Sequence, residues 1–382
     1  MPSAVHRGSA RRRRAPRLID RDEFSAWLRL LETPGVGREA ARALLTRFGS
    51  PEAVLGASTA ARSLVVQPAL ARALAVVPEP FEARLAAGWQ WLQGGDEPRD
   101  AIVVGDPRYP PALLESPDPP LLLYARGAIE LLQMPAIAIV GSRNPTPQGA
   151  ENARAFAGHL AGTGWAIVSG LALGIDGAAH EGALGAGGKT IAVVGTGPDI
   201  DYPPRHRALA QRIARDGLIV SEFAVGTPSI AANFPIRNRI IAGLARGTLV
   251  VEAAVQSGSL ITARLAAEAG REVFAIPGSI HSPQSRGCHA LIKQGAKLVD
   301  SAADIVEELG PLRPTPMRVP RSNAMPADRL LDALGHDPIG LDELVARTGT
   351  TAAELSARLL ELELQGRVAR LPGQRFQRVE RA

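Results

Sequence analysis

Cysteine, lysine and long apolar runs are scarce in this chain of 382 residues. Its one cysteine, Cys288, excludes an internal disulfide framework. No run of about 18 or more apolar residues occurs, so the sequence predicts no helix that spans a membrane. The arginines near the N-terminus are not followed by the apolar stretch of a secretory signal. Together these absences favour a cytoplasmic protein.

The chain holds only three lysines, Lys189, Lys293 and Lys297, so arginine supplies nearly all of its positive charge. The formal net charge is +5, but residues 1–21 alone contain seven arginines against Asp20. The rest of the chain is close to neutral, with 36 basic and 37 acidic residues. A nucleic-acid-binding face must therefore come from where the arginines lie rather than from their number. We expect residues 1–21 to be a disordered basic tail, either passively solvated or making non-specific phosphate contacts.

Helical patterns dominate residues 22–95. The stretch from Leu31 to Leu45 predicts a helix, a tight turn at Gly35 and Gly37, and a second helix. This is the pattern of a helix-hairpin-helix, whose turn amides can approach a phosphate, and a plain packing hairpin is the alternative. Residues 101–135, where prolines separate short apolar pieces, lead into the main domain.

Strand-like and helix-like segments alternate from Ala136 to about Leu309. Short β-rich runs between helices are typical of a parallel sheet covered on both faces. Small or polar residues follow the strands, at the edge where open α/β sheets bind ligands. We therefore predict an α/β fold, a Rossmann-like doubly wound and mostly parallel sheet, over residues 100–310. The predicted strands are 136–140, 165–168, 190–194, 218–220, 248–251, 272–276 and 297–299, and the predicted helices include 148–161, 205–214, 236–245 and 260–269.

The C-terminal part has a different pattern. Residues 311–327 hold several prolines and no periodicity, which indicates a linker. After it, three helices and a hairpin predict a winged-helix domain over residues 328–382. The predicted helices are 328–334, 341–347 and 353–364, and the predicted strands are 368–371 and 375–379.

The first candidate binding segment is Gly141-Ser142-Arg143, between a buried strand and a helix. Gly141 lets a ligand approach the backbone, Ser142 and nearby amides can donate to a phosphate at the helix N-terminus, and Arg143 adds a positive charge. Neither a dinucleotide fingerprint nor a Walker A loop is present. The alternative is structural, with Arg143 paired to Glu222 or Glu252.

The second candidate segment contains Phe234, Arg237, Asn238 and Arg239 at the start of a predicted helix. An aromatic ring beside clustered guanidinium groups suits a single strand, because bases stack on the ring and arginines neutralise the backbone. The alternative places Phe234 in the core and pairs the arginines with acidic side chains.

The third candidate segment is Ser257-Gly258-Ser259, which opens another helix. Hydroxyls and amides at a helix N-terminus can form an anion pocket, whereas simple helix capping by Ser257 or Ser259 is the alternative.

Three arrangements resemble catalytic sites without meeting their requirements. Asp176 and His180 are four residues apart on a helix, which fits a cap and a packed histidine, and no third metal ligand stands at suitable spacing. Cys288 and His289 are adjacent, so their side chains point apart. Ser169-Gly170 is not part of a G-x-S-x-G elbow. We therefore predict no catalytic residue, no metal site and no cofactor.

These motifs, in this order, resemble the DprA/Smf family of DNA-processing proteins. The resemblance is dense from Asp100 to Leu309, and the flanks are similar to the family's SAM- or helix-hairpin-helix-like and winged-helix domains. It rests on Gly141-Ser142-Arg143, Ser169-Gly170, Gly174-Ile175-Asp176, His180, Gly188-Lys189-Thr190, Tyr202-Pro203, Ser221-Glu222, Phe234-Pro235, Arg237-Asn238-Arg239, Val251-Glu252-Ala253, Ser257-Gly258-Ser259 and Pro277-Gly278.

The resemblance implies a non-catalytic protein that binds single-stranded DNA, forms homodimers, protects incoming DNA and loads the RecA recombinase during natural transformation. It implies a dimer interface that includes Leu291 and Ile292. The predicted DNA-binding residues are Gly141, Ser142, Arg143, Ser169, Gly170, Phe234, Arg237, Asn238, Arg239, Ser257, Gly258 and Ser259.

Two other functions fit the sequence less well. Phosphoribohydrolases on related folds use a P-G-G-x-G-T loop, and the similar segment here, Pro277-Gly278-Ser279, lacks the second glycine and the threonine. A transcription factor would read DNA through the winged helix, but its second and third predicted helices are acidic, which suits a protein partner better than a phosphate-lined groove.

Overall fold

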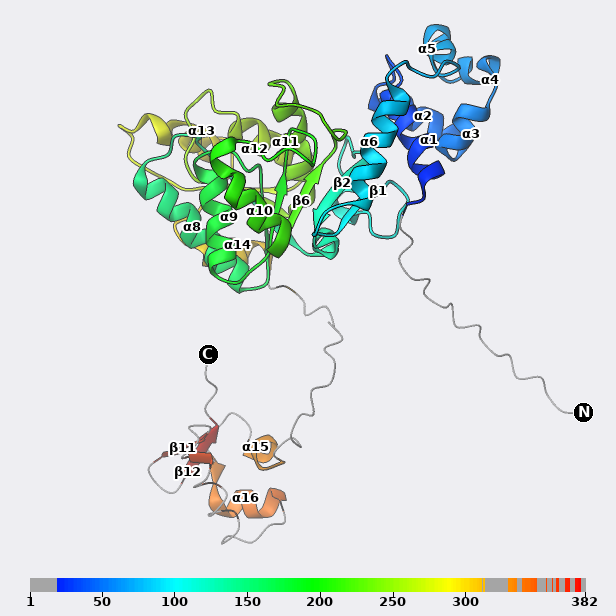
Figure 1. Ribbon diagram of the computed structural model, residues 1–382. Helices are drawn as coiled ribbons and strands as arrows, with labels where there is room; N and C mark the ends of the chain where they lie inside the picture. Colours follow the sequence, from blue (N-terminus) through cyan, green and yellow to red (C-terminus); the bar gives the residue numbers. More distant parts are fainter. Residues whose placement is uncertain are drawn as a thin grey trace, which may run out of the picture. The chain divides into compact units, whose positions relative to one another are not determined.

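The computed structural model describes residues 19–310, 312, 329–334, 339–348, 355, 359, 362–363, 368–371 and 375–378. The chain forms two compact units, divided between Arg313 and Pro314 (Figure 1). Nearly all of the predicted basic tail and of the predicted linker lies outside the described residues.

Six helices form the N-terminal part of the first unit, as the sequence predicts. Asp20 caps the first of them through a bond from the Glu23 amide, and Gly35 makes the following turn at a φ of 86°. Phe24 packs edge-on against Tyr124 of the sheet, with ring centroids 6.2 Å apart, so these helices cover the outer strands. The helices are α1 (Arg21–Glu32), α2 (Arg38–Phe48), α3 (Pro51–Gly56), α4 (Thr59–Ser63), α5 (Pro68–Ala73) and α6 (Phe81–Gln93).

The nine-stranded sheet has the order β1-β2-β6-β5-β4-β3-β7-β8-β9. The strands from β3 to β9 pair in parallel, as predicted, whereas β1 and β2 are antiparallel and extend the sheet past β6. The segment interpreted as a lead into the domain therefore supplies two strands. The strands are β1 (Arg99–Val103), β2 (Leu122–Gly127), β3 (Ala136–Val140), β4 (Ala166–Ser169), β5 (Thr190–Val193), β6 (Leu218–Ser221), β7 (Gly247–Val250), β8 (Glu272–Ala275) and β9 (Lys297–Leu298).

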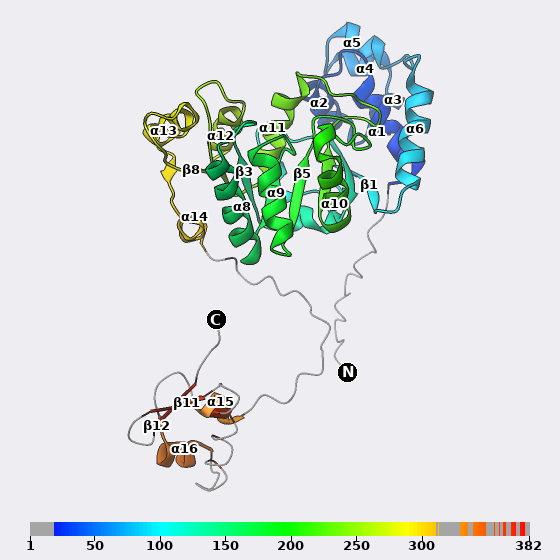
Figure 2. The same ribbon diagram turned by 60° about the vertical axis from the view of Figure 1, so that its left-hand side comes forward.

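Helices cover both faces of the parallel strands (Figure 2). One face carries α8, α9, α10 and α14, and the other carries α7, α11, α12 and α13. The direction of winding reverses between β3 and β7, which leaves a crevice at their carboxyl ends. The remaining elements of this unit are α7 (Pro111–Leu114), η1 (Ile129–Gln133), α8 (Pro147–Gly162), α9 (Ile175–Gly185), η2 (Pro204–His206), α10 (Arg207–Asp216), α11 (Asn233–Leu244), α12 (Ser259–Glu268), η3 (Pro283–Ser285), α13 (Arg286–Lys293) and α14 (Ala302–Leu309).

The second unit contains a small antiparallel sheet of order β10-β12-β11 and a leucine-rich core. The predicted strand pair is present, and most of the predicted helix 353–364 lies outside the described residues. The described elements are α15 (Arg329–Leu334), β10 (Ile339–Gly340), α16 (Leu341–Thr348), β11 (Val368–Leu371) and β12 (Arg375–Arg378).

Candidate nucleic-acid interface

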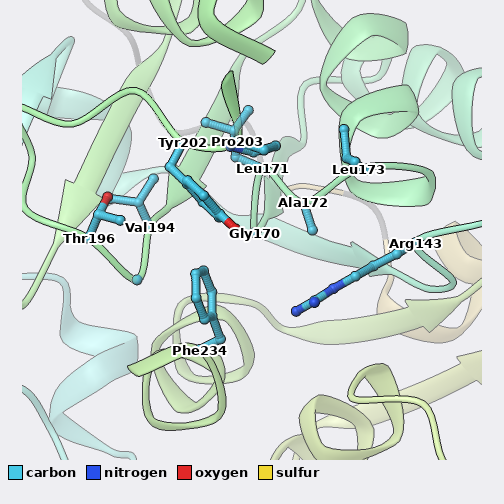
Figure 3. Close-up of a pocket in the computed structure, with 11 residues that line it drawn as sticks. Arg143, Gly170, Leu171, Ala172, Leu173, Val194, Thr196, Tyr202, Pro203 and Phe234 are labelled. Carbon is cyan, nitrogen blue, oxygen red and sulfur yellow. The ribbon is translucent and has the colours of Figure 1, made fainter. Parts of the chain in front are cut away.

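A cavity of about 740 Å³ opens at the carboxyl ends of β3 and β7, where the winding reverses. A smaller hollow of about 100 Å³ adjoins it and shares Arg143, Ala172, Tyr202 and Phe234 with it (Figure 3). Among the predicted binding residues, the large cavity is lined by Gly141, Ser142, Arg143, Phe234, Arg237, Asn238, Ser257, Gly258 and Ser259. The three predicted segments therefore meet at one place.

Arg143 is exposed and projects from the turn between β3 and α8. Its guanidinium carbon lies 5.8 Å from the centroid of the Phe234 ring, and Figure 3 shows the side chain reaching toward that ring. Within the described residues it forms no ion pair: Glu222 pairs with Arg239, and Glu252 bonds to Thr146. The structural alternative for Arg143 is thus not observed, and its charge faces the cavity.

Phe234, on the first turn of α11, is half-buried rather than part of the core. Its ring centroid lies 5.7 Å from that of Tyr202, which is 38% exposed. Two aromatic rings thus stand beside the Arg143 guanidinium. Tyr202 belongs to a motif that carries the family resemblance, but sequence reasoning did not include it in the site.

Arg237, one of the predicted DNA-binding residues, lines the cavity but is a buried side chain. It is 3% exposed, its guanidinium donates to the Val193 carbonyl, and a Cβ added to Gly170 would lie 2.2 Å from its Nη1. The carboxylate of Asp176 accepts the amides of Gly170 (3.1 Å) and Ala172 (3.3 Å). Burial lowers the pKa of Arg237 to about 10, while the Asp176 charge raises it. Arg237 therefore supports the floor of the cavity as a buried cation.

Arg239 does not line the cavity. It donates to Asp118 at 2.9 Å and to Glu222 at 2.5 Å, and its side chain is only 12% exposed. Burial raises the pKa of Asp118, but bonds from Arg239 and Arg42 outweigh this and lower it to about 2. Residues two apart on a helix point about 200° away from each other, so Arg237 and Arg239 cannot share one face. The predicted placement of Arg239 in the pocket is wrong, and the ion-paired alternative is correct.

The remaining predicted residues also divide into those that line the cavity and those that do not. Asn238 lines the cavity and donates to the Gly258 carbonyl at 3.4 Å. Ser257 and Ser259 share a hydroxyl–hydroxyl bond of 2.7 Å, and the Ser257 hydroxyl also accepts the amide of Ser259, the first residue of α12, at 3.4 Å. Ser169 lines neither hollow, because it is fully buried and donates to the Ile139 carbonyl at 2.6 Å.

Gly170 lines the small hollow but not the large cavity. Leu291 and Ile292, the residues predicted for a dimer interface, are half-buried on α13. Leu291 lines a separate groove of about 500 Å³ between α12 and α13, whereas Ile292 does not.

The residues set aside as non-catalytic have structural partners. Asp176 bonds to the β4–α9 loop rather than capping its own helix, and burial raises its pKa. His180 is packed as expected, 2.7 Å from the Thr190 hydroxyl. Cys288 is buried, and burial raises the pKa of its thiol to about 11. Residues that the structure describes include no cluster of three His, Cys, Asp or Glu side chains suited to a metal ion. None of the described helices is long and apolar enough to cross a membrane.

Comparison with known proteins assigns the family. Residues 100–310 match the family described as DNA recombination-mediator protein A, and residues 313–374 match the DprA winged helix domain. Protein Smf of Escherichia coli is 43% identical over 294 residues, which cover 74% of this chain and 78% of that protein. DNA processing protein DprA of Streptococcus pneumoniae is 51% identical over 203 residues, which cover 53% and 72% of the two chains.

Two solved structures are similar over the same region. DprA from Streptococcus pneumoniae has a TM-score of 0.66 and 39% identity, covering 74% of this chain and 97% of that one. DprA from Helicobacter pylori, a structure titled for its single-stranded DNA binding mode, has a TM-score of 0.51 and 32% identity, covering 55% and 95%. With its Rossmann-like sheet and winged helix, the chain belongs to the DprA/Smf family of DNA-processing proteins.

Proposed function

We propose that this chain is a non-catalytic, cytoplasmic single-stranded DNA-binding protein, which protects incoming DNA and loads RecA during natural transformation. The observation that carries the proposal is the group formed by Arg143, Phe234 and Tyr202 at the switch point of the sheet. Arg143 is not paired with any carboxylate in the part of the chain that the structure describes, so its charge suits a phosphate. The exposed ring surface suits an unpaired base. The Helicobacter pylori relative binds single-stranded DNA, which supports the same ligand here.

The proposal of binding without catalysis rests on where the reactive side chains lie. His180 is fully buried against Thr190. Asp176 lines the cavity, but it is only 7% exposed and its carboxylate already accepts the amides of Gly170 and Ala172, so we propose that neither residue moves a proton for a substrate. We therefore expect no nuclease, ATPase or phosphoribohydrolase turnover by the pure protein. Turnover that copurifies with the protein and is lost in Asp176→Asn or His180→Gln would contradict this.

We further propose a homodimer that uses the groove between α12 and α13. Val255, at its rim, is 61% exposed, and Leu260, Ile261 and Leu291 line it. An apolar groove next to an exposed valine favours a protein contact over solvent. Sedimentation of Leu291→Glu should then give a monomer where the parent chain gives a dimer, and an unchanged mass would contradict the proposal.

A gel-shift comparison of single-stranded and double-stranded DNA of one sequence, across a salt series, tests the DNA-binding proposal. We expect single strands to bind more tightly at every salt concentration. Equal or tighter duplex binding would instead indicate a general electrostatic binder. The RecA step needs its own test: the chain should speed RecA filament formation on single strands, and no acceleration would contradict that part alone.

A further inference from the structure

The N-terminus of α8 already holds a carboxylate from the protein itself. Thr146, the N-cap residue, donates its amide to Oε2 of Glu252 at 2.9 Å and its hydroxyl to Oε1 at 2.6 Å. The Thr146 hydroxyl oxygen in turn accepts the Gly149 amide at 3.0 Å. Both carboxylate oxygens of Glu252 are thus engaged at the positive end of a sixteen-residue helix.

This position matters because of the sheet topology. β3 and β7 are neighbours at the point where the winding reverses, and α8 is the helix that follows β3. In doubly wound sheets the N-terminus of that helix is where a nucleotide phosphate binds. Glu252 follows β7 and places its own negative charge at the same point.

The space around this carboxylate is filled. A Cβ added to Gly149 would lie 2.4 Å from the carboxyl carbon of Glu252, so the glycine is what lets the carboxylate lie against the helix. The main chain of Glu252 also accepts the Ser142 amide at 2.7 Å. Side chain and main chain of one residue therefore hold both ends of the 142–146 turn, from which Arg143 projects.

We propose that the carboxylate of Glu252 is a built-in anion that determines which ligands the N-terminus of α8 accepts. It occupies the phosphate position of the first strand–helix turn, excludes free nucleotide phosphates from it, and fixes the turn so that Arg143 faces the cavity. This role of Glu252 does not depend on whether the cavity binds DNA.

Anion rescue of Glu252→Ala tests the proposal without any DNA. The variant is made in an Arg143→Ala background, so that the exposed guanidinium cannot supply a phosphate response. Melting temperature is measured in inorganic phosphate and in chloride at equal ionic strength. We expect phosphate, relative to chloride, to raise the melting temperature of the double variant by at least about 2 °C more than it raises that of Arg143→Ala, which reports the general effect of the salt.

Two further variants make the result specific. Glu252→Gln keeps the side chain's volume without its charge, so it should melt lower than its parent and show no phosphate response beyond that of Arg143→Ala. Glu151→Ala removes an exposed carboxylate from the same helix while Arg154 keeps its bond to Glu181, so it should not respond either. If Glu252→Ala folds only in phosphate, the proposal is supported. A phosphate response of the double variant no larger than that of Arg143→Ala, whether as melting temperature or as refolding yield, would overturn it.

Discussion

The ring of Tyr202 lies 5.7 Å from the ring of Phe234, tilted by 40°, and the two residues come from different connections of the sheet. Both rings line the small hollow beside Arg143. Because Tyr202 is 38% exposed, part of its surface is available to a ligand. An aromatic pair next to a cation is the arrangement from which the DNA-binding proposal follows.

Tyr202→Ala should weaken single-strand binding by about 1–3 kcal/mol, because one stacking surface is lost. Tyr202→Phe is the matched control and should bind as the parent does, since it keeps the ring and loses only the hydroxyl. Fluorescence anisotropy with a short labelled oligonucleotide measures both. Equal loss in the two variants would mean that the hydroxyl, and not the ring, carries the contact.

Arg143→Ala should weaken single-strand binding and reduce the slope of log affinity against log salt by about 0.7, the value for one lost phosphate contact. The fold should be unaffected, because the side chain is exposed. Arg212→Ala, which removes an exposed arginine of α10 that lines neither hollow, serves as the control and should leave the slope unchanged. A slope that is equally unaffected in both variants would remove Arg143 from the site.

Arg237→Ala should mainly destabilise the fold. Removing this buried cation leaves the Val193 carbonyl without its guanidinium donor, which costs about 1–3 kcal/mol for a buried polar group, and removes the positive charge that favours ionised Asp176. Urea unfolding measures the loss, and Asp176→Asn in the same chain should recover part of it. A fully stable Arg237→Ala variant with weak DNA binding would show instead that Arg237 contacts phosphate directly.

Acid should destabilise the protein through His180. Burial lowers its pKa to about 3, so the folded state binds fewer protons than the unfolded state between about pH 3 and pH 6.5. The Thr190 hydroxyl donates to the Ile167 carbonyl and accepts Nδ1–H of His180, which leaves Nε2 buried without a described partner for a second proton.

Stability is therefore expected to fall as the pH drops through that window, by up to about 1.4 kcal/mol per pH unit from this group. Urea unfolding at pH 7 and pH 5 measures the change. His180→Gln cannot titrate, so its loss between these two values should be smaller. An equal loss in the variant would assign the acid sensitivity to other groups.

Much of the fold is predictable from the sequence because each parallel strand is a short apolar run followed by a small or polar residue. The strands β1 and β2 are not predicted in this way. Prolines interrupt the stretch between them, and β2 joins the parallel strands by antiparallel pairing with β6, from Tyr124 opposite Ser221 to Gly127 opposite Leu218. Such a contact between residues far apart in the chain leaves no local pattern.

The site is predictable in position but not in the role of each arginine. Residues that follow neighbouring strands must meet at one edge, so Arg143, Phe234 and Ser257 come together as expected. Whether Arg237 or Arg239 faces the sheet depends on how α11 is rotated about its axis, and the apolar pattern of this helix does not define that rotation. Likewise, the sequence makes Glu252 a candidate partner for Arg143, but in the structure the Glu252 carboxylate accepts the Thr146 hydroxyl.

Phe234→Leu provides the most direct test of single-strand binding at this site. Leucine keeps apolar volume against Gly195 while removing the ring on which a base would stack. The ratio of single-strand to duplex affinity should fall toward one, because stacking contributes about 1–3 kcal/mol per base only where bases are exposed. Melting temperature, measured in parallel, should change little. A stable Phe234→Leu variant with an undiminished preference for single strands would contradict the account.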